Sequence, residues 1–314
     1  MKYDLVGSFH NGLAFVRKND MYGFINAHGK EIVPPIYDHV GFTHDGYTRV
    51  VSDKKCGFIN SRGNEVILPQ YDFVRNFYNG LAPVSIKDKW GYINKQNELV
   101  IPAKFKEAMD FNEGFAVVKT FNKWGIIDLS GKFVVQPKYD EIGYCSHGAF
   151  CVELDNGNYG FISSQNDFQL ITSKKYDGAD DFKNGLARVR YYGEYGFINT
   201  NGEEVIPTQF YSVSDFSEGR AGICVSSESF GYIDKTGKIV IPPIYKEARD
   251  FSNGLALVKT KDDKLGYINT DGDMVIKLKY ALANDFSEGL ALVRKTCNDN
   301  WIFIDKRGNP VITL

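Results

Sequence analysis

A tandem repeat runs through the whole chain and restricts it to a few possible folds. A phrase of the form Phe-x-x-Gly-Leu-Ala, complete or close to it, begins near residues 9, 42, 77, 111, 144, 182, 216, 251 and 286. Successive copies are about 35 residues apart, a period that is typical of repeat architectures. No linker or low-complexity segment interrupts the series. We therefore predict that residues 1–314 form a single repeat array rather than two domains.

Two further phrases complete each repeat. The second reads aromatic-Gly-aromatic-Ile-Asn/Asp, as at residues 90–94, and the third reads Val-Ile-Pro followed by Tyr or Phe, as at residues 205–210. Between them an Asn or Asp stands three positions before a Gly, as at residues 26–29, which is typical of a hairpin turn closed by a left-handed Gly. Alternating apolar residues in the phrases predict three short antiparallel strands in each repeat.

The small residues of the repeat predict close packing. The Gly of the second phrase stands at positions 23, 57, 91, 125, 160, 196, 231 and 266. A Gly inside a strand indicates that another group lies against its backbone, and we expect aromatic rings of a neighbouring repeat to cover it. The Ala of the first phrase recurs in the same way and predicts that strands pack closely. The Pro of the third phrase has no N–H, so we expect it to end the strand ladder.

Each unit is too small to enclose a core, so we expect neighbouring repeats to share their stability. The chain has 23 Phe, 19 Tyr and 31 Gly, which favour strands and tight turns over helices. The sequence thus predicts an all-β protein in which nine three-stranded antiparallel repeats form an open β-solenoid or superhelix. The alternative is a closed ring that resembles a propeller, although nine blades would exceed the number that propellers usually have.

Charge, termini and cysteines narrow the class of partner. The formal net charge is −2, with 37 basic and 39 acidic residues, so the chain has no general attraction for nucleic acids or acidic membranes. No apolar run is long enough for a membrane-spanning helix, and the first residues lack the pattern of a secretory signal. The five cysteines are scattered, which indicates free thiols in a reducing compartment. We expect a cytoplasmic protein, although a processed exported form would begin in the same way.

The three phrases together resemble the bacterial WG repeat, also called the KWG repeat. That family is named for the Lys-Trp-Gly sequence found here at residues 89–91 and 123–125. The resemblance covers essentially the whole chain, although Tyr, Phe, Cys or Leu replaces the Trp in most copies. It implies a β-rich repeat module of bacteria that binds or scaffolds, without a shared catalytic activity. It supplies no functional residues.

No catalytic motif accompanies the repeat. The sequence contains no phosphate-binding glycine loop, nucleophile elbow or zinc-protease motif. His39 and His44 lie near acidic residues, and Cys145 lies near His147 and Cys151. Loop positions and packing inside a strand explain these groups better than a metal or thiol site does. We predict no catalytic residue, no bound metal and no cofactor.

The repeat creates two rows of charged residues. An Asp precedes the Phe of five copies, and we interpret this row as caps of the following turn. A basic residue follows the Leu-Ala-x-Val strand of five copies, either as a stripe for an acidic peptide, glycan or polynucleotide or as a partner of the Asp row that protects strand edges. The balanced net charge favours pairing. The basic row is Arg17, Lys119, Arg190, Lys259 and Arg294. The Asp row is Asp110, Asp181, Asp215, Asp250 and Asp285.

Repeats two and five depart most from the pattern. Both lose Leu-Ala and show one extra residue between the aromatic start and the Gly. Insertions in repeat arrays often lie on the binding face, although decay of a redundant copy explains them equally well. We therefore add Tyr144 and His147 of repeat five to the basic row as candidate binding residues.

These observations predict a non-enzymatic repeat scaffold that binds a protein or peptide over an extended surface. A carbohydrate or cell-envelope binding module is the first alternative, because exposed aromatic side chains can hold sugar rings. An enzyme with a site unlike the motifs above is the second alternative. We expect no nucleic-acid partner and no membrane span.

Overall fold

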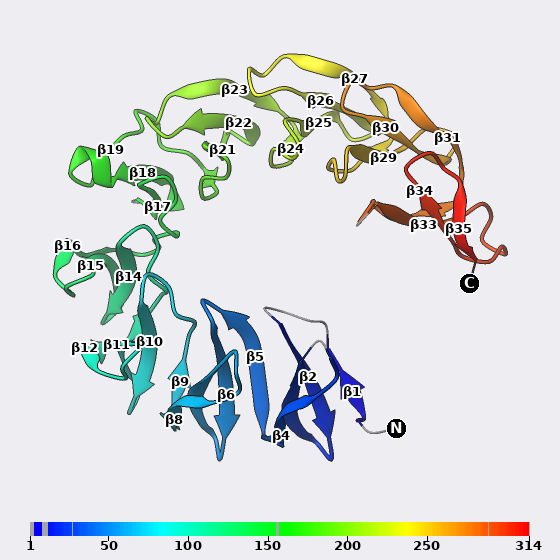
Figure 1. The fold of residues 1–314 in the computed structure, drawn as a ribbon. Coiled ribbons are helices and arrows are strands. Elements are labelled where there is room, and N and C mark those ends of the chain that lie inside the picture. Colours follow the sequence, from blue (N-terminus) through cyan, green and yellow to red (C-terminus); the bar gives the residue numbers. More distant parts are fainter. Residues whose placement is uncertain (1–2, 8–11, 27, 155–156, 288, 314) are drawn as a thin grey trace. The chain divides into compact units, whose positions relative to one another are not determined.

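The computed structural model of the chain is built from short antiparallel strands that are joined by turns (Figure 1). It describes all residues except 1–2, 8–11, 27, 155–156, 288 and 314, so Phe9, the start of the first copy, lies outside the described residues. Within the described part, helical structure is limited to short 3₁₀ segments such as η2 (Ser164–Asn166), and no helix there is long and apolar enough to cross a membrane. The prediction of an all-β protein is confirmed.

The chain divides into two compact units, unit 1 (Met1–Glu153) and unit 2 (Leu154–Leu314). The division falls inside repeat five, directly after its strand β17 (Ala149–Glu153). Each unit therefore contains several complete repeats. That residues 1–314 behave as one array stays a prediction.

Eight repeats each form a four-stranded antiparallel sheet in which the strands lie in chain order. We predicted three strands, and the structure adds a short first strand that pairs with the second. The first strands are β1 (Leu5–Val6), β5 (His39–His44), β9 (Phe73–Val74), β13 (Glu107–Ala108), β20 (Gly178–Ala179), β24 (Ser212–Val213), β28 (Glu247–Ala248) and β32 (Leu282–Ala283). The second strands are β2 (Leu13–Lys18), β6 (Tyr47–Ser52), β10 (Leu81–Ile86), β14 (Phe115–Thr120), β17, β21 (Leu186–Tyr191), β25 (Ala221–Ser226), β29 (Leu255–Lys259) and β33 (Leu290–Arg294).

The third and fourth strands form the hairpin that the turn pattern predicted. The third strands are β3 (Met21–Asn26), β7 (Lys55–Asn60), β11 (Lys89–Asn94), β15 (Lys123–Asp128), β18 (Tyr159–Ser163), β22 (Glu194–Asn199), β26 (Ser229–Ile233), β30 (Leu265–Asn269) and β34 (Ile302–Asp305). The fourth strands are β4 (Glu31–Tyr37), β8 (Glu65–Tyr71), β12 (Leu99–Phe105), β16 (Phe133–Tyr139), β19 (Gln169–Leu170), β23 (Glu204–Phe210), β27 (Ile239–Tyr245), β31 (Met274–Tyr280) and β35 (Pro310–Thr313).

The predicted turn chemistry joins these two strands. In repeat one, Oδ1 of Asn26 accepts hydrogen bonds from the backbone N–H groups of His28 and Lys30, both at 3.0 Å. Gly29 follows with a φ of +73°, in the left-handed region that favours Gly. The Asn or Asp and the Gly of this turn therefore have the roles that the sequence predicted.

The regular Gly of the second phrase lies against the backbone of its own repeat. Trp90 pairs with Phe105 and Tyr92 pairs with Ile101, so Gly91 faces a bulge formed by residues 102–104. A Cβ atom on Gly91 would lie 2.5 Å from the carbonyl oxygen of Ile101. The prediction that aromatic rings of a neighbouring repeat cover this Gly was wrong, because the bulged fourth strand already occupies the space.

The Pro of the third phrase does not end the ladder. Pro102 is exposed inside the bulge, and β12 continues to the buried Phe105, where pairing with Trp90 resumes. The missing N–H of Pro is tolerated because the bulged residues have no partner in the ladder. Our expectation that Pro stops the strand was therefore wrong.

The core lies between successive sheets. Phe58 and Tyr71 of the sheet β5–β8 pack with Phe77, Ala82 and Val84 of the sheet β9–β12, and all five side chains are buried. Among the described residues, each strand pairs only with strands of its own repeat, so the sheets of a unit join through side chains. The predicted sharing of the core between repeats, and the close packing at the regular Ala, are confirmed.

Repeats two and five contain no insertion before the turn Gly. Tyr37 and Gly46 are separated by as many positions as the corresponding residues of the regular copies. Thr43 and Cys145 occupy the place of the regular Phe; Thr43 shares a 2.6 Å hydrogen bond with Thr48, and Cys145 is buried. The predicted extra residue was wrong, because an aromatic residue one position earlier imitates the start of the phrase.

Candidate functional site

The basic row lies beside the Trp position of the WG pair. Lys119 pairs across the sheet with Trp124, and its Nζ lies 5.0 Å from the centroid of that ring. Arg294 lies over Trp301 in the same way, with 4.9 Å between Cζ and the ring centroid. A cation over an aromatic face is stabilising by about 0.5–2 kcal/mol. This contact gives the row a structural role inside its own sheet.

Carboxylates of the same repeat neutralise most of the row. Lys119 Nζ lies 3.1 Å from Glu107 Oε1, and Lys259 Nζ lies 3.0 Å from Glu247 Oε1. Arg17 Nη1 lies 4.0 Å from an oxygen of Asp20. Pairing with acids was expected, but the Asp row was the wrong partner, because acids of the adjacent first strand or turn lie closer. That the basic row binds a ligand stays a prediction.

The Asp row forms contacts with the preceding repeat. Lys183 Nζ donates to Asp215 Oδ2 at 2.6 Å, and Arg249 Nη1 donates to Asp285 Oδ2 at 3.4 Å. The interpretation of these two carboxylates as turn caps was therefore wrong. Asp110 differs, because its Oδ1 atom is buried and has no hydrogen-bond partner among the described residues.

Tyr144 and His147 lie at a turn of repeat five that is tied to repeat four. The carboxylate of Glu113 accepts hydrogen bonds from the backbone N–H groups of His147 at 3.0 Å and Gly148 at 2.7 Å. Burial alone would raise the pKa of Glu113, but these N–H groups and the Cys145 thiol outweigh it and hold the pKa below its usual value. The Tyr144 side chain is 49% exposed. That these two residues bind a partner stays a prediction.

Similar links join the turns of successive repeats in unit 2. Glu218 Oε2 accepts from the N–H of Gly254 at 2.8 Å, and Asn253 Oδ1 accepts from the N–H of Gly289 at 3.0 Å. The Ser217 hydroxyl donates to the carbonyl oxygen of Phe251 at 2.7 Å. Sequence reasoning missed this ladder, although Glu or Asn recurs directly before the turn Gly and is the signal for it.

The histidines and cysteines form no metal site in the described part of the chain. No three His, Cys, Asp or Glu side chains gather there as a metal-binding group. His44 Nδ1 lies 2.9 Å from the carbonyl oxygen of Phe77, and its ring packs at a tilt against Tyr78 with 3.9 Å between centroids. Cys145 and Cys151 are buried and form no disulfide with a described cysteine. These contacts agree with structural roles.

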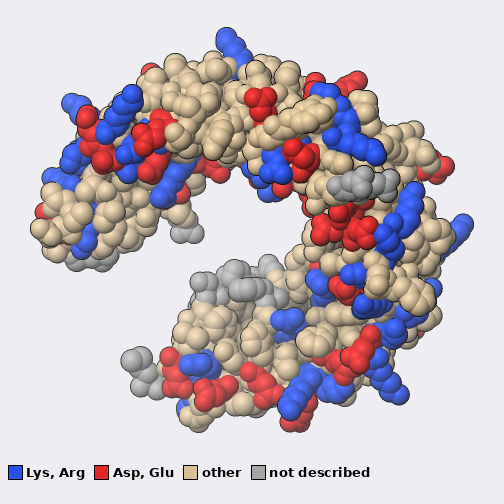
Figure 2. Space-filling model, turned by 180° about the vertical axis from the view of Figure 1, so that it is seen from behind, with Lys and Arg blue, Asp and Glu red and all other residues tan. Residues whose placement is uncertain are grey.

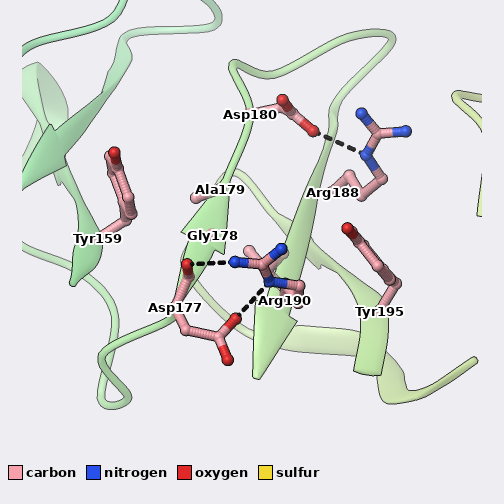
Figure 3. Close-up of a pocket in the computed structure, with 9 residues that line it drawn as sticks. Tyr159, Asp177, Gly178, Ala179, Asp180, Arg188, Arg190 and Tyr195 are labelled. Atoms are coloured by element: carbon pink, nitrogen blue, oxygen red, sulfur yellow. Dashed lines mark hydrogen bonds and ion pairs between the residues drawn. The ribbon is translucent and has the colours of Figure 1, made fainter. Parts of the chain in front are cut away.

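Unit 2 contains a pocket of about 310 Å³ at the start of repeat six (Figure 3). Tyr159 of β18 and Tyr195 of β22 lie on its two sides, with the side chains of β21 between them. Arg188 Nε donates to Asp180 Oδ2 at 2.7 Å. All of these groups belong to unit 2, and the pocket is lined mainly by polar atoms and Tyr rings.

Arg190, the second arginine of this pocket, also forms hydrogen bonds with a residue of its own repeat. Arg190 Nε donates to Asp177 Oδ1 at 2.7 Å, and Arg190 Nη2 donates to the backbone oxygen of Asp177 at 2.9 Å (Figure 3). The Arg190 Cζ atom also lies 5.9 Å from the ring centroid of Tyr195. Each arginine therefore has its own carboxylate, and the charges of the pocket balance.

A second hollow of about 420 Å³ shares Asp177 with this pocket. Tyr191 and Tyr192 line it, with 4.4 Å between their ring centroids, and Tyr192 is 85% exposed. Repeat five has a two-residue fourth strand, β19, where most other copies have seven residues. Residues 173–175, which follow β19, line the hollow instead of forming strand. The irregular end of repeat five thus forms one wall of this second hollow.

Basic and acidic side chains lie intermixed on the face drawn in Figure 2. The balance agrees with the ion pairs of the basic row and with the net charge of −2. An intermixed surface has no broad positive field that would attract a nucleic acid.

A sequence model described as the WG containing repeat matches the chain in nine segments. They are residues 1–22, 22–56, 57–90, 90–124, 124–158, 159–195, 195–227, 230–264 and 266–301. Nearly every residue of the chain is covered by these matches. The comparison with curated proteins gave no match.

Several solved structures are similar at low sequence identity. The designed protein Ika8 is 11% identical with a TM-score of 0.44, over 83% of this chain and 94% of that chain. BamB from Moraxella catarrhalis is 11% identical with a TM-score of 0.39, over 86% and 94%. PorZ of Porphyromonas gingivalis, a surface component of the type-IX secretion system, is 10% identical with a TM-score of 0.34, over 99% and 52%. TM-scores this low support no conclusion about the present chain.

Proposed function

The chain belongs to the WG containing repeat family, and from this premise we propose that it is a non-enzymatic scaffold that binds a protein or peptide. One observation carries the proposal: two adjoining hollows of unit 2 share Asp177 and are lined by exposed or half-exposed tyrosines. We name this surface the tyrosine patch. It consists of Tyr159, Tyr191, Tyr192, Tyr195, Arg188 and Arg190.

The composition of the tyrosine patch fits a protein partner. Tyr and Arg are the residues that most often dominate the energy of protein interfaces. Tyr offers a large rigid contact area at a low cost in conformational entropy. Two neighbouring hollows, rather than one enclosed cavity, suit an extended chain that places successive side chains in them.

The charges of the patch favour a partner of mixed charge. Arg188 and Arg190 are already paired with Asp180 and Asp177, both at 2.7 Å. Lys174 is paired with Glu204 at 2.8 Å. Because most charges of the patch are already paired, the affinity for a protein partner should depend only weakly on salt concentration. The affinity for an acidic polymer would instead fall steeply as the salt concentration rises.

The lining also supports a binding rather than a catalytic role. Among the described residues that line the two hollows there is no His and no Cys, the side chains that most often act as base or as activated nucleophile. Each Arg of the patch has its own carboxylate, so its charge is compensated before any ligand arrives.

A matched pair of variants tests the proposal. Tyr192 and Phe121 occupy the same position of their hairpin turns, with φ of 50° and 51°, and both are strongly exposed. Partners captured from the native lysate by the wild type are identified and purified, and their affinity is measured by calorimetry. We expect Tyr191→Ala/Tyr192→Ala to bind at least about 10-fold more weakly, while Phe121→Ala binds like the wild type. Equal binding by all three proteins would contradict the tyrosine patch.

The exposed pair of Tyr191 and Tyr192 makes a carbohydrate module the second candidate, because neighbouring aromatic rings can hold sugar rings. A glycan array that is probed with the same three proteins separates the two functions. Binding of neutral glycans that depends on Tyr192, without any captured protein, would favour the carbohydrate module.

A further inference from the structure

Unit 1 contains a pocket of about 300 Å³ whose charged side chains are not paired by the repeat itself. Strands β5 and β6 of repeat two form one part of it, and residues of repeats three and four form the rest. Its polar lining consists of His39, Arg49, Arg75, Asn76 and Asp110. The pocket lies wholly inside unit 1 and is separate from the tyrosine patch.

The guanidinium group of Arg75 has one buried donor that the described residues do not satisfy. Its backbone N–H donates to Pro83 at 2.9 Å, and its Cζ atom lies 5.8 Å from the ring centroid of Trp90. The Nε atom of the guanidinium is buried and has no hydrogen-bond partner among the described residues. No described carboxylate lies within 4.0 Å, the limit for an ion pair, of the Arg75 guanidinium nitrogens. A buried donor without a partner costs about 1–3 kcal/mol, which calls for a missing group.

Asp110 contributes a buried hydrogen-bond acceptor to the same pocket. Its Oδ1 atom is buried and unpartnered within the described part of the chain. Burial raises the pKa of Asp110, while the nearby positive charges of Arg75 and His44 lower it. Asp110 thus feels the charge of Arg75 but forms no direct ion pair with it, and the pocket lies between them.

Arg49 supplies a second uncompensated charge. Its Nη1 atom lies 3.5 Å from the carbonyl oxygen of Val74, and no described carboxylate lies within 4.0 Å of it. The residue opposite Arg49 in the first strand is Gly41, where a Cβ atom would lie 3.4 Å from the Arg49 Cβ. Among the described residues, the pocket therefore combines two guanidinium groups and one carboxylate that form no ion pair.

We propose that this pocket binds a small zwitterion of the amino-acid class, whose carboxylate contacts Arg49 and Arg75 and whose ammonium group contacts Asp110. A guanidinium matches a carboxylate in shape and charge and forms two parallel hydrogen bonds with it. The volume of about 300 Å³ lies at the lower end of ligand pockets and suits one small molecule.

The alternatives leave one charge uncompensated. A plain anion such as phosphate would satisfy the two arginines but would be repelled by Asp110. A plain cation would satisfy Asp110 but would be repelled by Arg49 and Arg75. A ligand that carries both charges compensates all three groups.

Calorimetry and thermal unfolding of the full chain test the proposal. The common amino acids are titrated one by one, with acetate, methylammonium and inorganic phosphate as probes of a single charge. We expect at least one amino acid to bind and raise Tm, and the single-charge probes to bind at least about 10-fold more weakly. Arg75→Gln should weaken binding by about 10- to 100-fold. Asp110→Asn should abolish the preference for the amino acid over its analogue that lacks the amino group.

Two further variants keep the result decisive if Arg75→Gln fails to fold. Gly41→Asp places a carboxylate opposite Arg49, and we expect it to abolish binding while circular dichroism keeps its strand signal. Arg188→Gln in unit 2 is the matched control and should bind the amino acid like the wild type. The proposal is wrong if no amino acid binds, if phosphate or acetate binds as well, or if Arg188→Gln removes the binding.

Discussion

The pockets of the two units share the repeat positions of Gly41 and Arg49, which are Asp180 and Arg188 in unit 2, but they differ in how their charges are paired. Arg49 in unit 1 and Arg188 in unit 2 are equivalent, and each directs Nη1 towards a backbone carbonyl oxygen of the next repeat. Asp180 faces Arg188 across the sheet at 2.7 Å, whereas Gly41 stands opposite Arg49. The single residue opposite this arginine, which lies in β5 in unit 1 and directly after β20 in unit 2, thus decides whether the guanidinium is compensated by the scaffold or left for a ligand.

This difference separates two kinds of position in the repeat. Positions that touch backbone, such as the regular Gly, are fixed by the geometry of the sheet in almost every copy. Positions on the first strand and its connection face a hollow, so their residues vary without loss of the fold. Arg75 in unit 1 corresponds to Ser214 in unit 2, for example. Departures from the repeat are therefore the place to look for binding.

The largest effect should come from the two glycines that flank the tyrosine patch. A Cβ atom on Gly196 would collide with the backbone carbonyl oxygen of Ile206, which cannot move without breaking the bulge. On Gly160 it would meet the Leu170 Cδ1 atom at 2.9 Å, a flexible end that can turn away. We expect Gly196→Ala to cost more than about 3 kcal/mol and Gly160→Ala about 1 kcal/mol, in urea unfolding of the full chain. Equal losses in the free energy of unfolding would show that contact with the backbone is not the reason why Gly is required at this position.

The next effect concerns the residue that distinguishes the two pockets. Asp180→Gly removes the ion pair of Arg188 and leaves a more flexible strand, so we expect a loss of about 1–2 kcal/mol. Gly41→Asp makes the opposite change and should leave stability unchanged or raise it by up to about 1 kcal/mol. Urea unfolding measures both. A loss of stability in Gly41→Asp would mean that unit 1 cannot accept the pairing seen in unit 2.

Periodicity and turn chemistry were sufficient to predict the repeat, its strands and its hairpins. Asn26 and Gly29 could be assigned to their turn because their chemistry is local. The cover of Gly91 was mispredicted because a bulge depends on register between strands, which a single phrase does not reveal. The short first strand was missed because two residues are too few to show alternation.

The site was less predictable than the fold. The basic row was recognised from its spacing, but the carboxylates that pair with it, such as Glu107 and Glu247, belong to the strand that was missed. Arg49, Arg75 and Asp110 stand in three different repeats and come together only through the stacking of sheets. No spacing within one repeat could have indicated them.

A smaller effect on stability should distinguish the hydrogen bonds that link the turns of successive repeats in the two units. The N–H groups of His147 and Gly148 stabilise the ionised form of Glu113 in unit 1, whereas Asn253 carries no charge at the equivalent position of unit 2. Because the pKa of Glu113 is lowered by folding, its contribution is present above the unfolded pKa of about 4.3 and is lost as pH falls through the folded pKa.

Glu113→Gln should therefore cost about 1 kcal/mol near pH 7 and nothing at a pH well below about 4, in urea unfolding. Asn253→Ala, the matched variant of unit 2, should have a loss that does not change over this pH range. A pH-independent loss in Glu113→Gln would contradict the role of the charge in the ladder.

The smallest effect, and the sharpest comparison, is to build the unit 1 pocket in unit 2. Asp250 already stands at the position of Asp110, so Asp180→Gly and Ser214→Arg supply the two differences that leave guanidinium groups unpaired. Asp215 stands where unit 1 has Asn76 and adds a negative charge, so we expect binding about 10-fold weaker than in unit 1. Calorimetry with the amino acid that binds the wild type, in a Gly41→Asp background that silences unit 1, measures it. If the variant with Asp180→Gly and Ser214→Arg shows no binding, unpaired charge alone does not make a site. The backbone of repeats two to four would then also contribute to the site of unit 1.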